Sequence, residues 1–108
     1  MARRILVGMA QHVGIVGCSA EGAALCYRTI CAEGPALLGA AHAHPEVTLH
    51  TPPLAAYVRA LDASDWDAVA ALMLASAEVL ARAGADFLIC PDNTIHAALP
   101  QVLPHSPR

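Results

Sequence analysis

The chain has 108 residues, of which 56% are hydrophobic, 4% aromatic and 14% charged, and its net charge is −3. This length and apolar share suit one small globular domain with a packed core. The negative net charge and the lack of a basic run argue against nucleic-acid binding. The sequence contains no lysine, which excludes a Walker A phosphate loop and a pyridoxal phosphate Schiff base.

The spacing of the cysteines and the lack of a recognisable secretory signal near the N-terminus indicate a reducing compartment. No Cys-x-x-Cys pair occurs, and the apolar run Ile5–Ala10 is shorter than the core of most secretory signals, about 7–15 residues. No apolar stretch approaches the roughly 18 residues that span a membrane. We therefore expect a cytoplasmic protein without membrane contact, and reduced thiols at all four cysteines: Cys18, Cys26, Cys31 and Cys90.

The first predicted unit is a strand, a glycine-containing loop and a helix. Residues 1–11 are interpreted as an extension and residues 12–99 as the domain. Val13–Val16 reads as a strand and Ala23–Ala32 as a helix. The loop between them lacks the glycine spacing of a dinucleotide fingerprint, so it is interpreted as a tight turn. Cys18 in this loop is expected to be a small buried hydrophobe rather than a nucleophile.

A second strand follows a predicted loop over residues 34–45. The alternation of polar and apolar residues predicts a strand at Glu46–His50. The loop histidines, His42 and His44, do not form a convincing metal site with His50, because no nearby cysteine or carboxylate completes the ligand set. Thr51 follows the strand directly and is a candidate for substrate contact.

The clearest helix lies between residues 64 and 82. A short helix is expected at Leu54–Leu61, and Ser64 is predicted to cap the longer helix behind it. Apolar residues recur at three- and four-residue intervals from Trp66 to Ala81, which is typical of one buried helix face. Gly84 is expected at the C′ position. The helix leads into a further strand, which completes a βαβ unit.

That last strand carries the strongest functional signal. Phe87–Cys90 is a short apolar run, as expected for a parallel strand covered on both faces. The polar residues Asp92, Asn93 and Thr94 follow Pro91, and a helix is expected to start near Thr94. Open α/β sheets bind ligands where a strand ends in a polar turn that opens a helix. The predicted fold class is α/β, with a three-layer arrangement of a parallel sheet flanked by helices.

The sequence Ala-Gly-Ala-Asp at residues 83–86, followed after the strand by Pro-x-Asn-Thr-x-His at residues 91–96, resembles the first half-site of the aspartate/glutamate racemase family. The resemblance implies cofactor-independent racemisation of an acidic amino acid, without a metal. It covers residues 12–104, about half of the family's length, so residues 100–108 would lead into a further strand and a second pseudo-symmetric domain. The chain would then be a fragment, a truncated product or half of an assembly.

The resemblance also implies roles for individual residues. Asp92 stands where the family usually has its first catalytic cysteine. A carboxylate, with an ordinary pKa near 4, is a weaker base than a thiolate with one near 8.5, which argues against symmetrical chemistry by two cysteines. The implied substrate contacts are Asn93, Thr94, Ser19 and Thr51. His96 and Cys18 are expected to support the site, His96 chiefly by bracing the turn.

Two other functions stay open. A lyase or decarboxylase on the same scaffold would need protonation from one face only. A non-catalytic half-domain would bind a carboxylate without turnover. The expected partners are a small amino-acid substrate and a second copy of the chain or a missing second domain, because a three-stranded sheet leaves an edge and a face uncovered.

Overall fold

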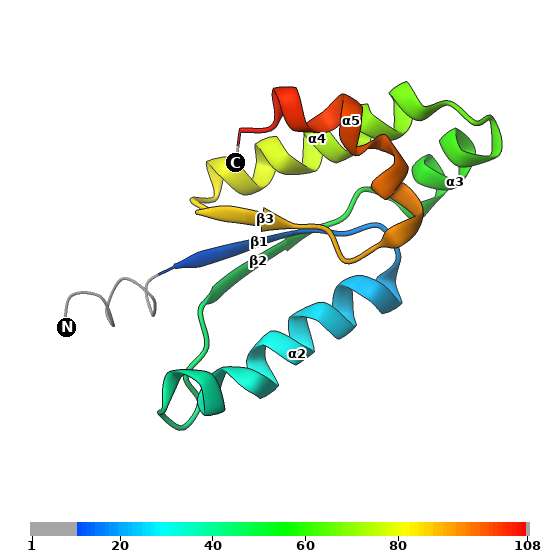
Figure 1. The fold of residues 1–108 in the computed structure, drawn as a ribbon. Coiled ribbons are helices and arrows are strands. Elements are labelled where there is room, and N and C mark those ends of the chain that lie inside the picture. The colour runs from blue at the N-terminus through cyan, green and yellow to red at the C-terminus, as the bar shows by residue number, and fades with distance from the viewer. Residues whose placement is uncertain (1–10, 108) are drawn as a thin grey trace.

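The computed structural model describes residues 11–107, which form a three-stranded parallel sheet flanked by helices (Figure 1). The strand order is β2-β1-β3, with β1 at His12–Val16, β2 at Glu46–His50 and β3 at Phe87–Ile89. All five residues of β1 are buried, as expected for the central strand of a covered parallel sheet. The predicted α/β class and all three strands are confirmed.

Helices lie on both faces of the sheet (Figure 1). The helix α2 (Ala20–Leu38) covers one face, while α4 (Trp66–Arg82) crosses the other and contacts β1 and β2. The short helix α3 (Leu54–Asp62) packs against α4. Along the chain, each strand is connected to the next strand by at least one helix, as parallel pairing requires.

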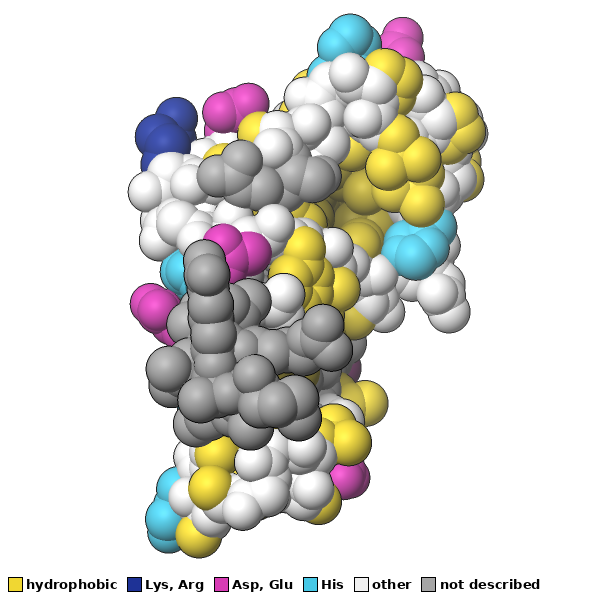
Figure 2. Space-filling model, turned by 60° about the vertical axis from the view of Figure 1, so that its left-hand side comes forward, with side chains coloured by type: hydrophobic (Ala, Val, Ile, Leu, Met, Phe, Trp, Pro, Cys, Tyr) yellow, Lys and Arg dark blue, Asp and Glu magenta, His cyan; other side chains and the backbone are white. Residues whose placement is uncertain are grey.

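The core lies mainly between α4 and the sheet. Val69, Met73 and Leu80 on α4 are buried in one core cluster with Val16 of β1, so the predicted apolar face of this helix is confirmed. The helix α2 contributes less, because only two of its residues are buried, and Leu37 is 82% exposed. On the face shown in Figure 2, hydrophobic side chains gather around a hollow, and Lys and Arg side chains are sparse.

The first helix is longer than the sequence predicted. It begins at Ala20 and continues to Leu38, through the segment expected to be a loop. Pro35 lies inside the helix and removes one backbone donor, but the residues after it continue the helix and Gly39 ends it. Gly39 has φ 74° and its N–H donates to the Pro35 carbonyl at 2.9 Å. The true stop signal was therefore Gly39, four residues after the proline.

The boundaries of α4 differ slightly from the prediction. The N-cap is Asp65, whose Oδ1 accepts a hydrogen bond from the Ala68 N–H at 3.0 Å. Ser64, the predicted cap, instead has φ 52° in the preceding turn. Gly84 has φ 97°, a backbone conformation that favours glycine, and its predicted position just beyond the helix is confirmed.

The segment after residue 92 is helical in short pieces. The helix predicted to start near Thr94 is a 3-10 helix, η1 (Asn93–Ala98), and α5 (Leu99–Val102) and η2 (Leu103–His105) follow it. Pro100 and Pro104 lie in the first turns of α5 and η2, where a missing N–H costs least. Residues 99–105 are therefore helical, and α5 packs on α4.

The remaining expectations concern the N-terminal extension and membrane-spanning helices. The predicted extension, residues 1–11, lies outside the described residues except for Gln11. Within residues 11–107, none of the helices combines the length and apolar character needed to cross a bilayer.

Candidate active site at the carboxyl edge of the sheet

The carboxyl ends of the three strands bring the predicted site residues to one edge. The loop after β1 is joined to the end of β2 by a hydrogen bond from the Gly17 N–H to the His50 carbonyl at 3.0 Å. Thr51 lies directly against Gly17, and a Cβ atom at position 17 would collide with the Thr51 methyl group. Glycine is required here for this close approach. Thr51 is thereby fixed beside the loop that carries Cys18 and Ser19.

Asp92 reaches across this edge to the start of α2. Its Oδ2 atom accepts a hydrogen bond from the Ser19 backbone N–H at 3.0 Å. Ser19 is the N-cap of α2, and its Oγ accepts from the Gly22 N–H at 3.2 Å. Free N–H groups and the dipole of a 19-residue helix attract negative charge to this point. The Asp92 carboxylate therefore occupies the anion-binding end of α2.

The Asp92 side chain contacts the start of α2 rather than the helix that directly follows Asp92. The residue is the N-cap of η1, yet its side chain makes no capping hydrogen bond there. It instead accepts a hydrogen bond from Ser19, the N-cap of α2, which lies 73 residues earlier in the sequence. The Ser19 hydroxyl and backbone N–H each form a hydrogen bond within the protein.

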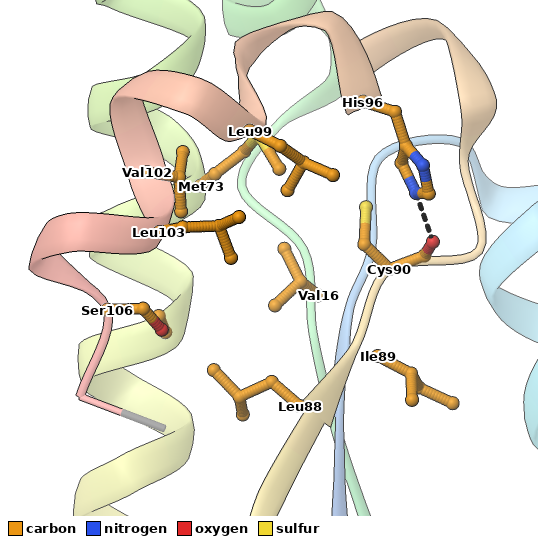
Figure 3. A pocket seen from close by; sticks show the side chains of 11 residues that line it. Val16, Met73, Leu88, Ile89, Cys90, His96, Leu99, Val102, Leu103 and Ser106 are labelled. Atoms are coloured by element: carbon orange, nitrogen blue, oxygen red, sulfur yellow. Dashed lines mark hydrogen bonds between the residues drawn. The ribbon is translucent and has the colours of Figure 1, made fainter.

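His96 braces the turn between β3 and η1, as the sequence analysis expected. Its Nε2 atom lies 2.6 Å from the Cys90 carbonyl oxygen (Figure 3). A carbonyl oxygen can only accept, so Nε2 carries the proton and donates. The bond ties the first turn of η1 to the end of β3. The turn that carries Asp92 is thereby held at both ends.

Two thiols lie close to Asp92 and both are kept neutral. Burial, together with the charge of Asp92 and the neighbouring Cys90, raises the pKa of Cys18 to about 11. Burial also raises the pKa of Cys90, which is half-buried at the end of β3. Since the thiolate is the reactive form of cysteine, a raised pKa argues against a nucleophile or base at either position. This agrees with the expectation that Cys18 is a small buried hydrophobe.

The sequence analysis missed Tyr57. Its side chain on α3 is 0% exposed, and its hydroxyl has no hydrogen-bond partner among residues 11–107. Burial and then three neighbouring acidic groups raise its pKa, namely Cys18, Cys90 and Asp92. The hydroxyl thus lies within electrostatic reach of the same groups that surround Asp92. A lone tyrosine on an amphipathic helix gave no sequence signal for this position.

The remaining predicted contacts are accessible from solvent. Thr51, Asn93 and Thr94 are exposed. The side chains of Asn93 and Thr94 form no hydrogen bond with any other described residue, and both follow Asp92 directly along η1. These hydroxyl and amide groups are therefore available to an incoming ligand.

An apolar cavity of about 230 Å³ lies beside this edge, between β3, α4 and α5. Figure 3 shows His96 and Cys90 at one end of it, with Val16, Leu88 and Leu99 among the residues along its length. Neither Asp92 nor Ser19 lines it. Its lining suits a hydrocarbon group, whereas the groups suited to a carboxylate lie at the carboxyl edge of the sheet.

Comparisons with known proteins add no family assignment. The chain matches no protein-family model, and the search of curated proteins also returned no match.

Proposed function

We propose that this protein, alone or as the first half of a larger assembly, racemises an acidic amino acid such as aspartate or glutamate without a cofactor. The observation that carries the proposal is the Asp92 carboxylate at the carboxyl edge of the sheet, bonded to the Ser19 N–H at the N-terminus of α2. The proposal also rests on the racemase-like motif at residues 83–96. In this proposal, the α/β domain described here is the first of the two pseudo-symmetric domains of a racemase.

In this proposal Asp92 removes the α-proton of the substrate. The Cα–H bond breaks, its proton moves to the Asp92 carboxylate, and the electron pair is delocalised into the substrate carboxylate. Asn93, Thr94 and Thr51 would donate hydrogen bonds to that carboxylate, whose negative charge increases as the bond breaks. Return of a proton to the opposite face gives the other enantiomer. A second acid is required there, because one group cannot serve both faces of a planar carbanion.

The group on the opposite face would come from a second copy of the chain or from a second domain. Burial raises the pKa of both Cys18 and Cys90, which lowers the share of reactive thiolate at neutral pH further. They do not replace the base that a racemase needs for the reverse direction. With Asp92 as the one base proposed within this chain, a second candidate function is favoured. In it, Asp92 acts as the single base of a lyase or decarboxylase.

Product analysis distinguishes these functions. Purified protein is incubated with L-aspartate and with L-glutamate, and the products are separated by chiral chromatography. Racemisation predicts the D-enantiomer with no loss of amino acid. Release of ammonia or carbon dioxide would instead indicate a lyase or a decarboxylase. Binding of the amino acid with no product of either kind would leave only a carboxylate-binding role.

A further inference from the structure

The cavity between β3, α4 and α5 has a buried floor and an open side (Figure 3). Four of the residues that line it are buried in the protein: Val16, Met73, Ala77 and Val102. Leu103 of η2 also lines it but is 66% exposed. The cavity therefore reaches solvent beside η2, and a small molecule can enter it without separating the core from the sheet.

The lining of this cavity is almost entirely hydrocarbon. Among residues 11–107, no aspartate, glutamate or arginine lines it. The side chains with nitrogen or oxygen atoms that do are His96 and Ser106, and the Nε2 atom of His96 already donates to the Cys90 carbonyl at 2.6 Å. Burying a charge without a partner is costly. The lining therefore disfavours an ion and favours a neutral, apolar ligand.

The volume of the cavity sets the size of such a ligand. An apolar protein cavity of ~150 Å³ binds benzene, and the cavity beside β3, at about 230 Å³, is half as large again. By this comparison it would hold a compact hydrocarbon of about seven to nine carbon atoms. A ligand of that size loses its apolar surface to water on binding and gains van der Waals contacts with the lining.

We propose that this cavity is a binding site for a neutral hydrocarbon group of the size of an alkylbenzene. The buried floor, the open side at Leu103, the uncharged lining and the volume all fit such a ligand. The site is independent of the proposed function, because neither Asp92 nor Ser19 lines the cavity.

Toluene is a suitable probe, because it is an alkylbenzene without charge. Its dissociation constant and its position are measured by NMR titration of the methyl signals, and the melting temperature is followed as its concentration rises. Benzoate is the matched control ligand, since it carries a carboxylate in place of the toluene methyl group.

Two substitutions on α4 form a matched pair. Ala77→Leu places an isobutyl group at the floor of the cavity, where it competes with the ligand for space. Ala75→Leu makes the same change at an exposed position of the same helix that does not line the cavity. Where Ala77→Leu fails to fold, Val102→Phe narrows the cavity from α5 and takes its place in the comparison.

We expect toluene to shift the methyl signals of Val16, Leu88 and Val102, which line the cavity, and not those of Val58, which is exposed on α3. The melting temperature should rise with toluene concentration, because a ligand that binds only the folded state stabilises it. The substitution that narrows the cavity should weaken toluene binding at least tenfold, and Ala75→Leu should bind as wild type does. Benzoate should bind at least tenfold more weakly than toluene.

The proposal would be overturned if toluene left the signals of Val16, Leu88 and Val102 unmoved. Equal toluene affinity in wild type and in the folded variant with the narrowed cavity would also overturn it, as would equal affinity for benzoate and toluene. Toluene binding at these residues without α-proton exchange in aspartate or glutamate would support the proposed site and contradict only the proposed function.

Discussion

The Asp92 carboxylate accepts a hydrogen bond from the backbone N–H of Ser19, at 3.0 Å, although 73 residues separate the two in sequence. The bond joins the turn after β3 to the first turn of α2. It connects the two segments that the sequence predicted to be functional. Any ligand that binds at the N-terminus of α2 must compete with this internal carboxylate or bind beside it.

The hydroxyl of Ser19 stabilises the start of α2. Replacement by alanine removes the hydrogen bond to the Gly22 N–H, and loss of such a cap costs about 1 kcal/mol in the free energy of unfolding. Ser19→Thr keeps the hydroxyl and should lose less. Urea unfolding of both variants beside wild type measures the difference. Equal stability of wild type and Ser19→Ala would show that the cap contributes nothing.

Gly17 and Thr51 are coupled by direct contact. A Cβ atom at position 17 would collide with the Thr51 methyl group, so Gly17→Ala should destabilise the protein by about 1–3 kcal/mol. Thr51→Ser removes that methyl group. The double variant Gly17→Ala with Thr51→Ser should therefore be more stable than the sum of the single effects predicts. A double-mutant cycle by urea unfolding measures the coupling, and strict additivity would contradict the contact.

Cys18 is expected to make the free energy of unfolding decrease as the pH becomes alkaline. Its pKa rises from an ordinary value of 9 to about 11 in the folded protein, through burial first and then the nearby Asp92. Because the folded state holds this proton more tightly, its stabilising effect is complete below pH 9 and is lost as the pH rises to about 11. Cys18→Ala should flatten this part of the decline. Urea unfolding at pH 7, 9 and 10.5 tests this, and parallel curves for the two proteins would contradict it.

His96 is expected to position the turn rather than transfer protons. Its Nε2–H donates to the Cys90 carbonyl, and the side-chain amide of glutamine also carries a donor. His96→Gln should thus retain more α-proton exchange than His96→Ala, with an unchanged pH profile. Initial exchange rates between pH 5.5 and 8.5 make the comparison. Equal, complete loss in both variants would indicate an acid/base role for the imidazole instead.

Much of the fold follows from local sequence patterns. Val13–Val16 and Phe87–Cys90 are apolar runs that predict buried parallel strands, and the spacing of apolar residues from Trp66 to Ala81 predicts α4. The extension of α2 through Pro35 was missed, because a Gly-Pro pair normally signals a break and its tolerance depends on the residues that follow. The short helices after residue 98 were missed for the same reason, since their prolines fall in first turns.

The sequence predicted which edge of the sheet carries the candidate site, but not the contacts between residues at that edge. Parallel topology brings the carboxyl ends of the strands together, and this places Ser19, Thr51 and Asp92 in one region. No local pattern specifies that the Ser19 N–H, rather than its hydroxyl, meets Asp92. Tyr57 could not be recognised either, because its burial depends on the packing of α3 against α4, which is a long-range property.

Deuterium exchange at Cα tests the central claim most directly. L- and D-aspartate and L- and D-glutamate are incubated in D₂O with wild type, Asp92→Asn and Asp62→Asn, and loss of the α-proton signal is followed by NMR. Asp62 is an exposed carboxylate at the end of α3, so its variant controls for a change of charge. General acid–base catalysis typically contributes 10²–10⁴-fold.

We predict exchange by wild type and by Asp62→Asn, and a loss of at least about 100-fold in folded Asp92→Asn. That result would establish Asp92 as a working acid/base in this chain or in the assembly it forms. Exchange that persists in Asp92→Asn, or no exchange by the folded wild-type protein, would contradict the account.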